Sequence, residues 1–243
     1  MSDKSFTKEN IDIYLKELAK EFRKRTGKSI PAEIVLIDDA SVLINYGFRD
    51  MTYDMDAIIN AAGSMKESIN AVGDKYSLPS GWLNDDFVMT ESYTPRILRF
   101  SKYYHTYSNV ITFRTVTGEH LIAMKLKAGR KYKNDLSDII GILAEHDKRE
   151  EQISIEMIKQ AVIDLYDSYD AITDEMKLFI EKTIESGNYE SIYETIRQTE
   201  IENQNTLIEY QKSKPGVINN DNANDVIDAL RKRKDRSFSS VSV

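Results

Sequence analysis

The chain has 243 residues, of which 41% are hydrophobic and 30% charged, and its net charge at pH 7 is −7. This composition provides for a buried core, and the acidic balance argues against a broadly basic nucleic-acid-binding surface. The sequence has no cysteine and no run of about 18 apolar residues, the length that a membrane span needs. We therefore expect a cytoplasmic protein without disulfides, thiolate metal ligands or membrane segments.

The first predicted element is a helix that ends near Thr26. Apolar residues recur at helical spacing from Ile11 to Phe22. Thr7 has the chemistry of an N-cap, and Gly27 that of a helix stop.

The next stretch, residues 33–60, is the one on which the functional prediction rests. Residues 34–37 are apolar and β-branched, which predicts a buried strand, and the acidic pair Asp38-Asp39 follows directly. One or two helical turns come next, and Gly47 breaks them.

A second strand is predicted over residues 52–59. Asp54 and Asp56 lie on either side of Met55. Residues two apart in a strand point to the same face, so both carboxylates can converge on one spot. Such a pair suits a hard divalent cation such as Mg²⁺.

The rest of the chain is predicted to be mainly helical, with one further pair of strands. Trp82 is expected in the core, and the run Arg231–Arg236 concentrates basic charge near the C-terminus. The predicted elements are a helix at 64–75, two strands within 97–116, and helices at 120–129, 134–146, 153–166, 173–186, 188–212 and 224–234.

Lys125, Arg130 and Asp135 admit two interpretations. The ammonium and the guanidinium could clamp a triphosphate, one as a point charge and the other as a fork. Alternatively, the three side chains form an ion-pair cluster that locks two helices together. The sequence alone leaves both open.

Several blocks resemble the nucleotidyltransferase (polymerase β-like) superfamily, in particular its small bacterial members related to AbiE-type abortive-infection toxins. The first is the strand, turn and helix of residues 33–60 with Gly47-Phe48-Arg49, Thr52 and the Asp54-Met55-Asp56 triplet. The segment LPSGWLNDDF and the later HLIAMKLKAGRKYKNDLSDI also resemble these relatives. The resemblance covers residues 30–145.

The resemblance implies an α+β fold with a mixed sheet flanked by helices, and the change in composition beyond Lys148 predicts an all-helical extension. The expected domains are residues 1–148 (nucleotidyltransferase-like), 149–213 (helical extension) and 214–243 (linker, short basic helix and disordered tail).

The resemblance also implies a function. Asp54 and Asp56 would be catalytic and bind two Mg²⁺ ions, while Ser41, Arg49, Lys125 and Arg130 would contact a nucleoside triphosphate. The acceptor would be an RNA, in particular a tRNA 3′ end, or a protein hydroxyl, and an antitoxin is a further expected partner. The alternative is a catalytically degenerate protein that acts as an interaction module in phage defence or a toxin–antitoxin pair.

The chain departs from the family's pattern at Asp38-Asp39, where the relatives have a glycine turn. Glycines let the backbone approach the phosphates. The two aspartates, with Asp135, are therefore possible accessory residues. Their carboxylates could help to bind metal, or they could cap the following helix and fill the phosphate seat themselves.

Overall fold

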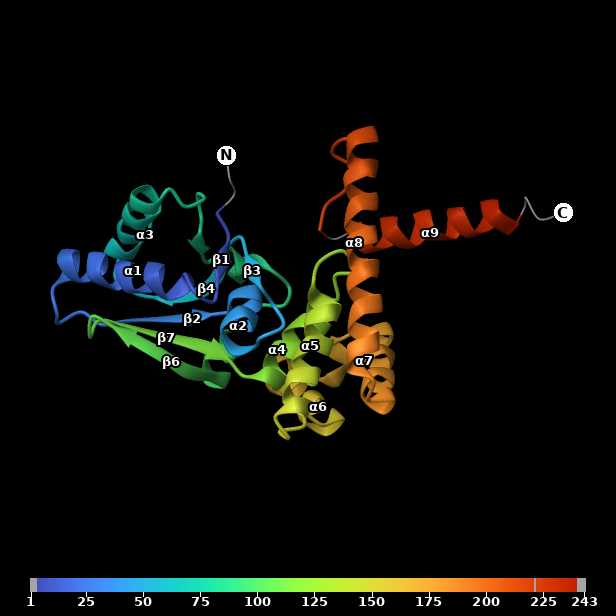
Figure 1. The fold of residues 1–243 in the computed structure, drawn as a ribbon, viewed down its shortest axis with the longest axis horizontal. Coiled ribbons are helices and arrows are strands. Elements are labelled where there is room, and N and C mark those ends of the chain that lie inside the picture. Colours follow the sequence, from blue (N-terminus) through green and yellow to red (C-terminus); the bar gives the residue numbers. More distant parts are fainter. Residues whose placement is uncertain (1–3, 221, 240–243) are drawn as a thin grey trace.

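The computed structural model describes residues 4–220 and 222–239, with side chains up to Lys232 in the last helix. The fold is α+β, as predicted: a mixed sheet with flanking helices lies next to a group of C-terminal helices (Figure 1). None of the helices in this part of the chain is both long and apolar enough to cross a membrane.

The main sheet has five strands in the spatial order β5-β4-β2-β7-β6. Strand β2 is antiparallel to β4 and parallel to β7, so the sheet is mixed. A separate antiparallel pair joins β1 to β3. The strands are β1 (Phe6–Thr7), β2 (Ala32–Leu36), β3 (Met51–Thr52), β4 (Met55–Asn60), β5 (Leu83–Asn84), β6 (Ser101–Tyr107) and β7 (Ile111–Val116).

The predicted helices are confirmed, with shifts of a few residues at their ends. Short 3₁₀ segments at Asp86–Met89, Pro95–Phe100 and Tyr169–Ala171 join the larger elements. The helices are α1 (Ile11–Thr26), α2 (Asp38–Asn45), α3 (Ser64–Tyr76), α4 (Gly118–Ala128), α5 (Asp135–Lys148), α6 (Ile155–Tyr166), α7 (Asp174–Ser186), α8 (Tyr189–Ser213) and α9 (Ala223–Ser239).

Strand β2 separates two hydrophobic cores. Ile34 and Leu36 pack with α1 and α3 on one face of the sheet. Val35, together with Ile37 just after the strand, packs on the other side with helices α4 to α7. All four side chains are at most 1% exposed. Because side chains alternate along a strand, one short apolar run can serve both cores.

Three local predictions are wrong. Thr7 does not begin the first helix: it lies in β1, and Asn10 is the N-cap residue. The predicted strand over residues 52–59 is divided into β3 and β4, so Asp54 lies just before β4. Residues 97–100, the start of the stretch predicted to hold two strands, belong instead to a 3₁₀ segment that begins at Pro95.

The last helix is longer than predicted, running to Ser239. Of the tail predicted to be disordered, residues 237–239 therefore belong to α9, and residues 240–243 lie outside the described part of the chain.

Candidate functional site

The candidate site begins where β2 ends and α2 starts. The Ile37 amide donates a hydrogen bond to the Asp56 carbonyl at 3.0 Å, which joins this junction to β4. Asp38 follows with a φ of 44°, in the left-handed region that favours glycine. The backbone thus has the conformation of a glycine turn although the residue is an aspartate.

The side chain of Lys125 lies at the centre of a buried ionic network. It projects from α4, is only 2% exposed, and contacts four carboxylates from α2 and α5. Its ammonium bonds Asp38, lies 2.7 Å from Asp138, and is 3.4 Å and 3.7 Å from Asp39 and Asp135.

Two arginines complete the network. Arg130 bonds Asp135 at 2.6 Å through Nε and Asp38 at 3.1 Å through Nη2. Arg49 bonds Asp39 at 2.9 Å and Asp138 at 2.5 Å. The ion-pair interpretation of Lys125, Arg130 and Asp135 is therefore observed, and the network connects α2, α4 and α5.

The charges in this network stabilise one another. Burial alone would raise the pKa of Asp38, but Lys125 and Arg130 hold it below its ordinary value. Burial would likewise lower the pKa of Lys125, yet the surrounding carboxylates, Asp138 foremost, raise it well above its ordinary value. Asp39 behaves differently, because burial together with the charges of Asp38 and Asp138 raises its pKa.

Asp54 and Asp56 lie outside the network. In the described part of the chain neither carboxylate forms a salt bridge, and Asp54 is exposed while Asp56 is half-buried. Burial, followed by the negative charges of Asp38 and Asp54, raises the pKa of Asp56 to about 6. The two predicted carboxylates are therefore close enough to repel each other, and Asp38 joins them.

Two sets of carboxylates are candidate metal ligands. Oxygens of Asp38, Asp39 and Asp138 lie within 4.8 Å of one another and could hold a metal ion. However, the Lys125 ammonium already contacts all three. Within the described residues Asp54 and Asp56 form no salt bridge, and carboxylate oxygens are the ligands that Mg²⁺ prefers. Their role as metal ligands stays a prediction.

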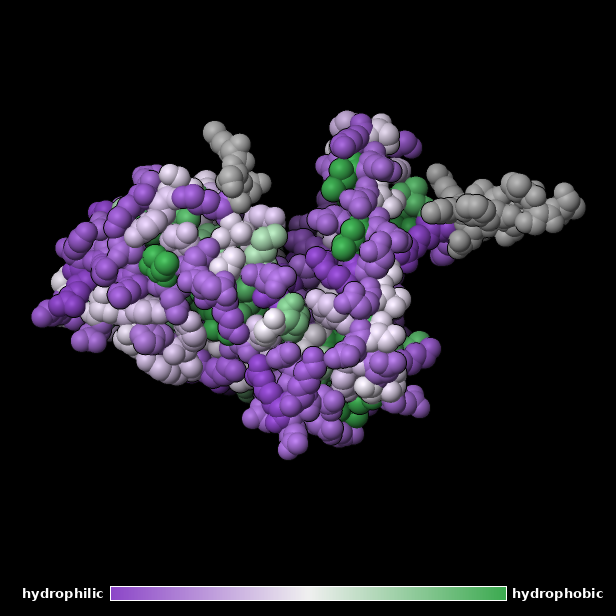
Figure 2. All heavy atoms as spheres, in the orientation of Figure 1, coloured by the Kyte–Doolittle hydropathy of each residue, from purple (hydrophilic) through white to green (hydrophobic). Residues whose placement is uncertain are grey.

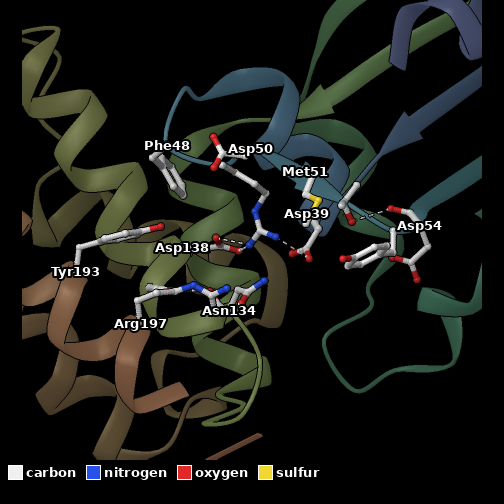
Figure 3. A pocket seen from close by; sticks show the side chains of 13 residues that line it. Asp39, Phe48, Asp50, Met51, Asp54, Asn134, Asp138, Tyr193 and Arg197 are labelled. Carbon is white, nitrogen blue, oxygen red and sulfur yellow. Dashed lines mark hydrogen bonds and ion pairs between the residues drawn. The ribbon is translucent and has the colours of Figure 1, made fainter. Parts of the chain in front are cut away.

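A cleft of about 320 Å³ lies between the loop preceding β4 and helices α5 and α8; Asp54 lines it, whereas Asp56 does not. Figure 3 shows Asp39 and Asp54 on one side, and Asn134, Tyr193 and Arg197 facing them. Hydrophilic residues dominate this face of the molecule in Figure 2, including the hollow between the sheet and α8. The cleft is lined by Asp39, Phe48, Arg49, Asp50, Met51, Thr52, Tyr53, Asp54, Asn134, Ser137, Asp138, Tyr193 and Arg197.

Ser41, Asp38 and Asp39, which the sequence analysis names as site residues, make contacts within the fold. The buried Ser41 hydroxyl accepts a hydrogen bond from the Val116 amide at 3.0 Å, which fixes α2 to β7. The expectation that Asp38 and Asp39 cap α2 is wrong: Ile37 is the N-cap residue, and the α2 start has no side-chain cap. Both carboxylates instead turn toward the buried cations.

The sequence analysis missed Asp138 and the cleft residues of α8 as members of the site. Asp138 had a detectable signal, because it lies one helical turn after Asp135 and therefore on the same face. Tyr193 and Arg197 had none, since they lie within an acidic amphipathic helix far along the chain.

The chain shows no match to protein families, curated proteins or solved structures: none of the three comparisons found one. The resemblance to nucleotidyltransferases therefore rests on the motifs described above.

Proposed function

We propose that the chain is a Mg²⁺-dependent nucleotidyltransferase of the toxin-like kind. The observation that carries the proposal is the state of Asp56: a half-buried carboxylate next to Asp38 and Asp54 that has no salt bridge within the described residues, and whose raised pKa shows that the charges of Lys133 and Arg130 only partly offset burial and repulsion. A carboxylate in this setting needs a compensating positive charge, and a divalent ion shared with Asp54 would supply it.

In this proposal Asp54 and Asp56 hold the metal, and Asp38 adds negative charge beside them. Mg²⁺, when bound, would activate the attacking hydroxyl and neutralise charge on the leaving pyrophosphate. Lys125 and Arg130 both bond Asp38, so their side chains lie next to this carboxylate. Phosphate oxygens could replace Asp38 as the partner of these cations.

The test is incubation of the protein with labelled nucleoside triphosphates, Mg²⁺ and total RNA, followed by a search for label on RNA and on protein. Asp54→Asn and Asp56→Asn should each reduce transfer by at least the roughly 10–100-fold seen when a residue supporting a metal ligand is lost. Asp74→Asn, which removes one exposed carboxylate on α3, is the matched control.

Measuring the stability of each variant distinguishes a loss of activity from a loss of folding in this test. Asp56→Asn should leave the apoprotein at least as stable as the native chain, because it relieves repulsion between like charges. Full transfer by the Asp54→Asn/Asp56→Asn double variant would place the chemistry elsewhere.

A second candidate function is a degenerate nucleotidyltransferase that acts as an interaction module. Lys125, Arg130 and Arg49 are all bonded to carboxylates, and only about 10 Å³ remains free beside Asp38, Lys125 and Arg130. That is room for about one water molecule. Calorimetry that detects no Mg²⁺-triphosphate binding would favour this candidate.

A further inference from the structure

The charged residues that line the cleft indicate which acceptor substrate it can bind. Its lining includes four carboxylates, Asp39, Asp50, Asp54 and Asp138, and among the described lining residues only Arg49 and Arg197 are cations. Arg49 is already bonded to Asp39 and Asp138. The cleft is therefore net negative, and the charges of a bound nucleoside triphosphate and two Mg²⁺ ions would roughly cancel.

A polynucleotide end is a poor fit for such a cleft. Binding to nucleic acid depends on cations that neutralise phosphates. Among the described residues that line the cleft, Arg197 is the cation left for this role, and its guanidinium already donates to the Asn134 side chain at 2.5 Å; Lys133, whose charge acts on Asp56, lies outside the lining. Outside the run Arg231–Arg236, which has five basic residues and one acidic residue, the chain carries a net charge of −11, against −7 for the whole.

The same lining suits a basic peptide segment. Tyr53 is 54% exposed, and it lines the cleft together with Tyr193, so aromatic faces are available to a lysine or arginine side chain. Within the described residues the buried Arg49 Nε has no hydrogen-bond acceptor. A peptide carbonyl that displaces the side chains covering this atom could satisfy the donor.

We infer that the acceptor in this cleft is a serine, threonine or tyrosine hydroxyl of a protein segment rich in lysine and arginine. The transfer step rests on the proposed function. The acceptor oxygen bonds to the α-phosphorus, the bond from that phosphorus to its bridging oxygen breaks, and pyrophosphate leaves. The hydroxyl proton passes to the Asp54 carboxylate, which lines the cleft.

A peptide with the sequence of residues 230–243 is a probe of this chemistry, since it contains five basic residues and four serines. Its binding to the full-length protein is measured by fluorescence anisotropy without nucleotide or metal, so the result does not depend on catalysis. A peptide with glutamine at the five basic positions is the control and should not bind. Failure of the basic peptide to bind would overturn the inference.

Two cleft variants sharpen the test. Asp50→Asn, at an exposed lining residue, should weaken peptide binding roughly two- to fivefold, as loss of one exposed charge pair does. Arg197→Gln should strengthen peptide binding, whereas it would weaken binding of an RNA oligonucleotide. The opposite pair of effects for Arg197→Gln would identify an RNA acceptor and overturn the inference.

A transfer experiment then incubates the protein with both the basic peptide and the RNA oligonucleotide, labelled nucleoside triphosphate and Mg²⁺. Label on the peptide supports both proposals. Label on RNA overturns the inference and leaves the proposed function intact. Peptide binding without any transfer supports a basic partner in the cleft and counts against the proposed enzyme.

Discussion

Asp38 combines a backbone conformation typical of glycine with a carboxylate that two buried cations require. Glycine would relieve about 1–2 kcal/mol of left-handed strain at this position. Its partners Lys125 and Arg130 would then lose a carboxylate, and breaking a buried ion pair costs roughly 3–5 kcal/mol. The ion pairs outweigh the strain, which explains why an aspartate is stable here.

Replacing both aspartates should separate stability from nucleotide affinity. Asp38→Gly/Asp39→Gly should lower the free energy of unfolding by a few kcal/mol, since buried cations lose their partners. It should also tighten Mg²⁺-triphosphate binding, because Lys125, Arg130 and Arg49 each lose at least one carboxylate partner and can bond a phosphate oxygen in its place, while Asp135 and Asp138 remain. Urea denaturation and calorimetry measure the two effects. The control is Asp38→Asn/Asp39→Asn, which removes the charges but keeps the side-chain size.

Weaker triphosphate binding in the glycine variant would mean that the aspartates serve the site. That outcome would contradict the idea that Asp38 and Asp39 occupy the position where a phosphate would bind.

The sequence identified candidate groups of the site but not their partners. Their spacing makes Asp54 and Asp56 candidates, and their role as metal ligands stays a prediction. The contacts of Lys125 with Asp38 and Asp39 join residues 86 or more positions apart, which no local periodicity encodes. The triphosphate-clamp interpretation of Lys125 and Arg130 stays a prediction.

At the scale of the element, α8 packs on α5 through polar residues. Glu200 is 2% exposed, and it accepts hydrogen bonds from the Leu136 and Ser137 amides at 2.9 and 3.1 Å. It thus caps the first turn of α5 from another helix. Asn203, also buried, donates to the Lys131 carbonyl at 2.7 Å.

This arrangement explains what the sequence could not show. Helical spacing predicted α8, but a pattern search treats glutamate and asparagine as outward-facing residues. Here they form part of the buried face: Glu200 bonds the first turn of α5, and Asn203 bonds the loop before it. Only the tertiary fold reveals which face of α8 is covered.

The Glu200 carboxylate gives the packing of α8 a pH dependence. Burial is the largest cause that raises its pKa, to about 7 from the ordinary 4.5. Because the pKa of Glu200 is higher in the folded than in the unfolded state, its protonation contributes fully to the free energy of unfolding below about pH 4.5. This contribution is lost as the pH rises through about 7. Glu200→Gln is always neutral, so its stability relative to the native chain should increase between pH 5 and pH 8.

Urea midpoints of both proteins at the two pH values provide the measurement, because other titrating groups cancel in the difference. Glu202→Gln, at an exposed position on the same helix, is the control. A constant difference between the native chain and Glu200→Gln would show that Glu200 does not titrate in this range.

At the scale of the whole molecule, the sheet and the C-terminal helices share a core. Ile158, Val162 and Ile180 from α6 and α7 are fully buried and belong to the same cluster as Val35 of β2. The predicted domain boundary after residue 148 coincides with the end of α5. However, this hydrophobic cluster contains residues from both sides of that boundary. The α+β class was predictable from residue patterns, whereas the sharing of one core between distant segments was not.

A chain that ends at residue 148 should fail to fold. It would expose the partners of α6 and α7, and each large apolar side chain contributes about 1.5–3 kcal/mol when buried. Several such losses exceed the roughly 5–15 kcal/mol by which domains are stable. A chain that ends at residue 213 loses residues 214–243, in which Ala223 and Ile227 are the buried apolar residues among the described side chains, and should stay folded.

Circular dichroism and thermal unfolding of the two truncated chains measure this directly. A cooperative transition in the 148-residue chain would establish the first predicted domain as an independent unit.

The network around Lys125 also constrains how the sequence can change over evolutionary time. Its ammonium contacts four carboxylates from α2 and α5, and each of them also bonds an arginine: Arg130 bonds Asp38 and Asp135, and Arg49 bonds Asp39 and Asp138. Substituting the lysine alone removes one counter-charge from all four carboxylates. We therefore expect these positions to vary as one set among relatives, with paired replacements on α2, α4 and α5 rather than isolated ones.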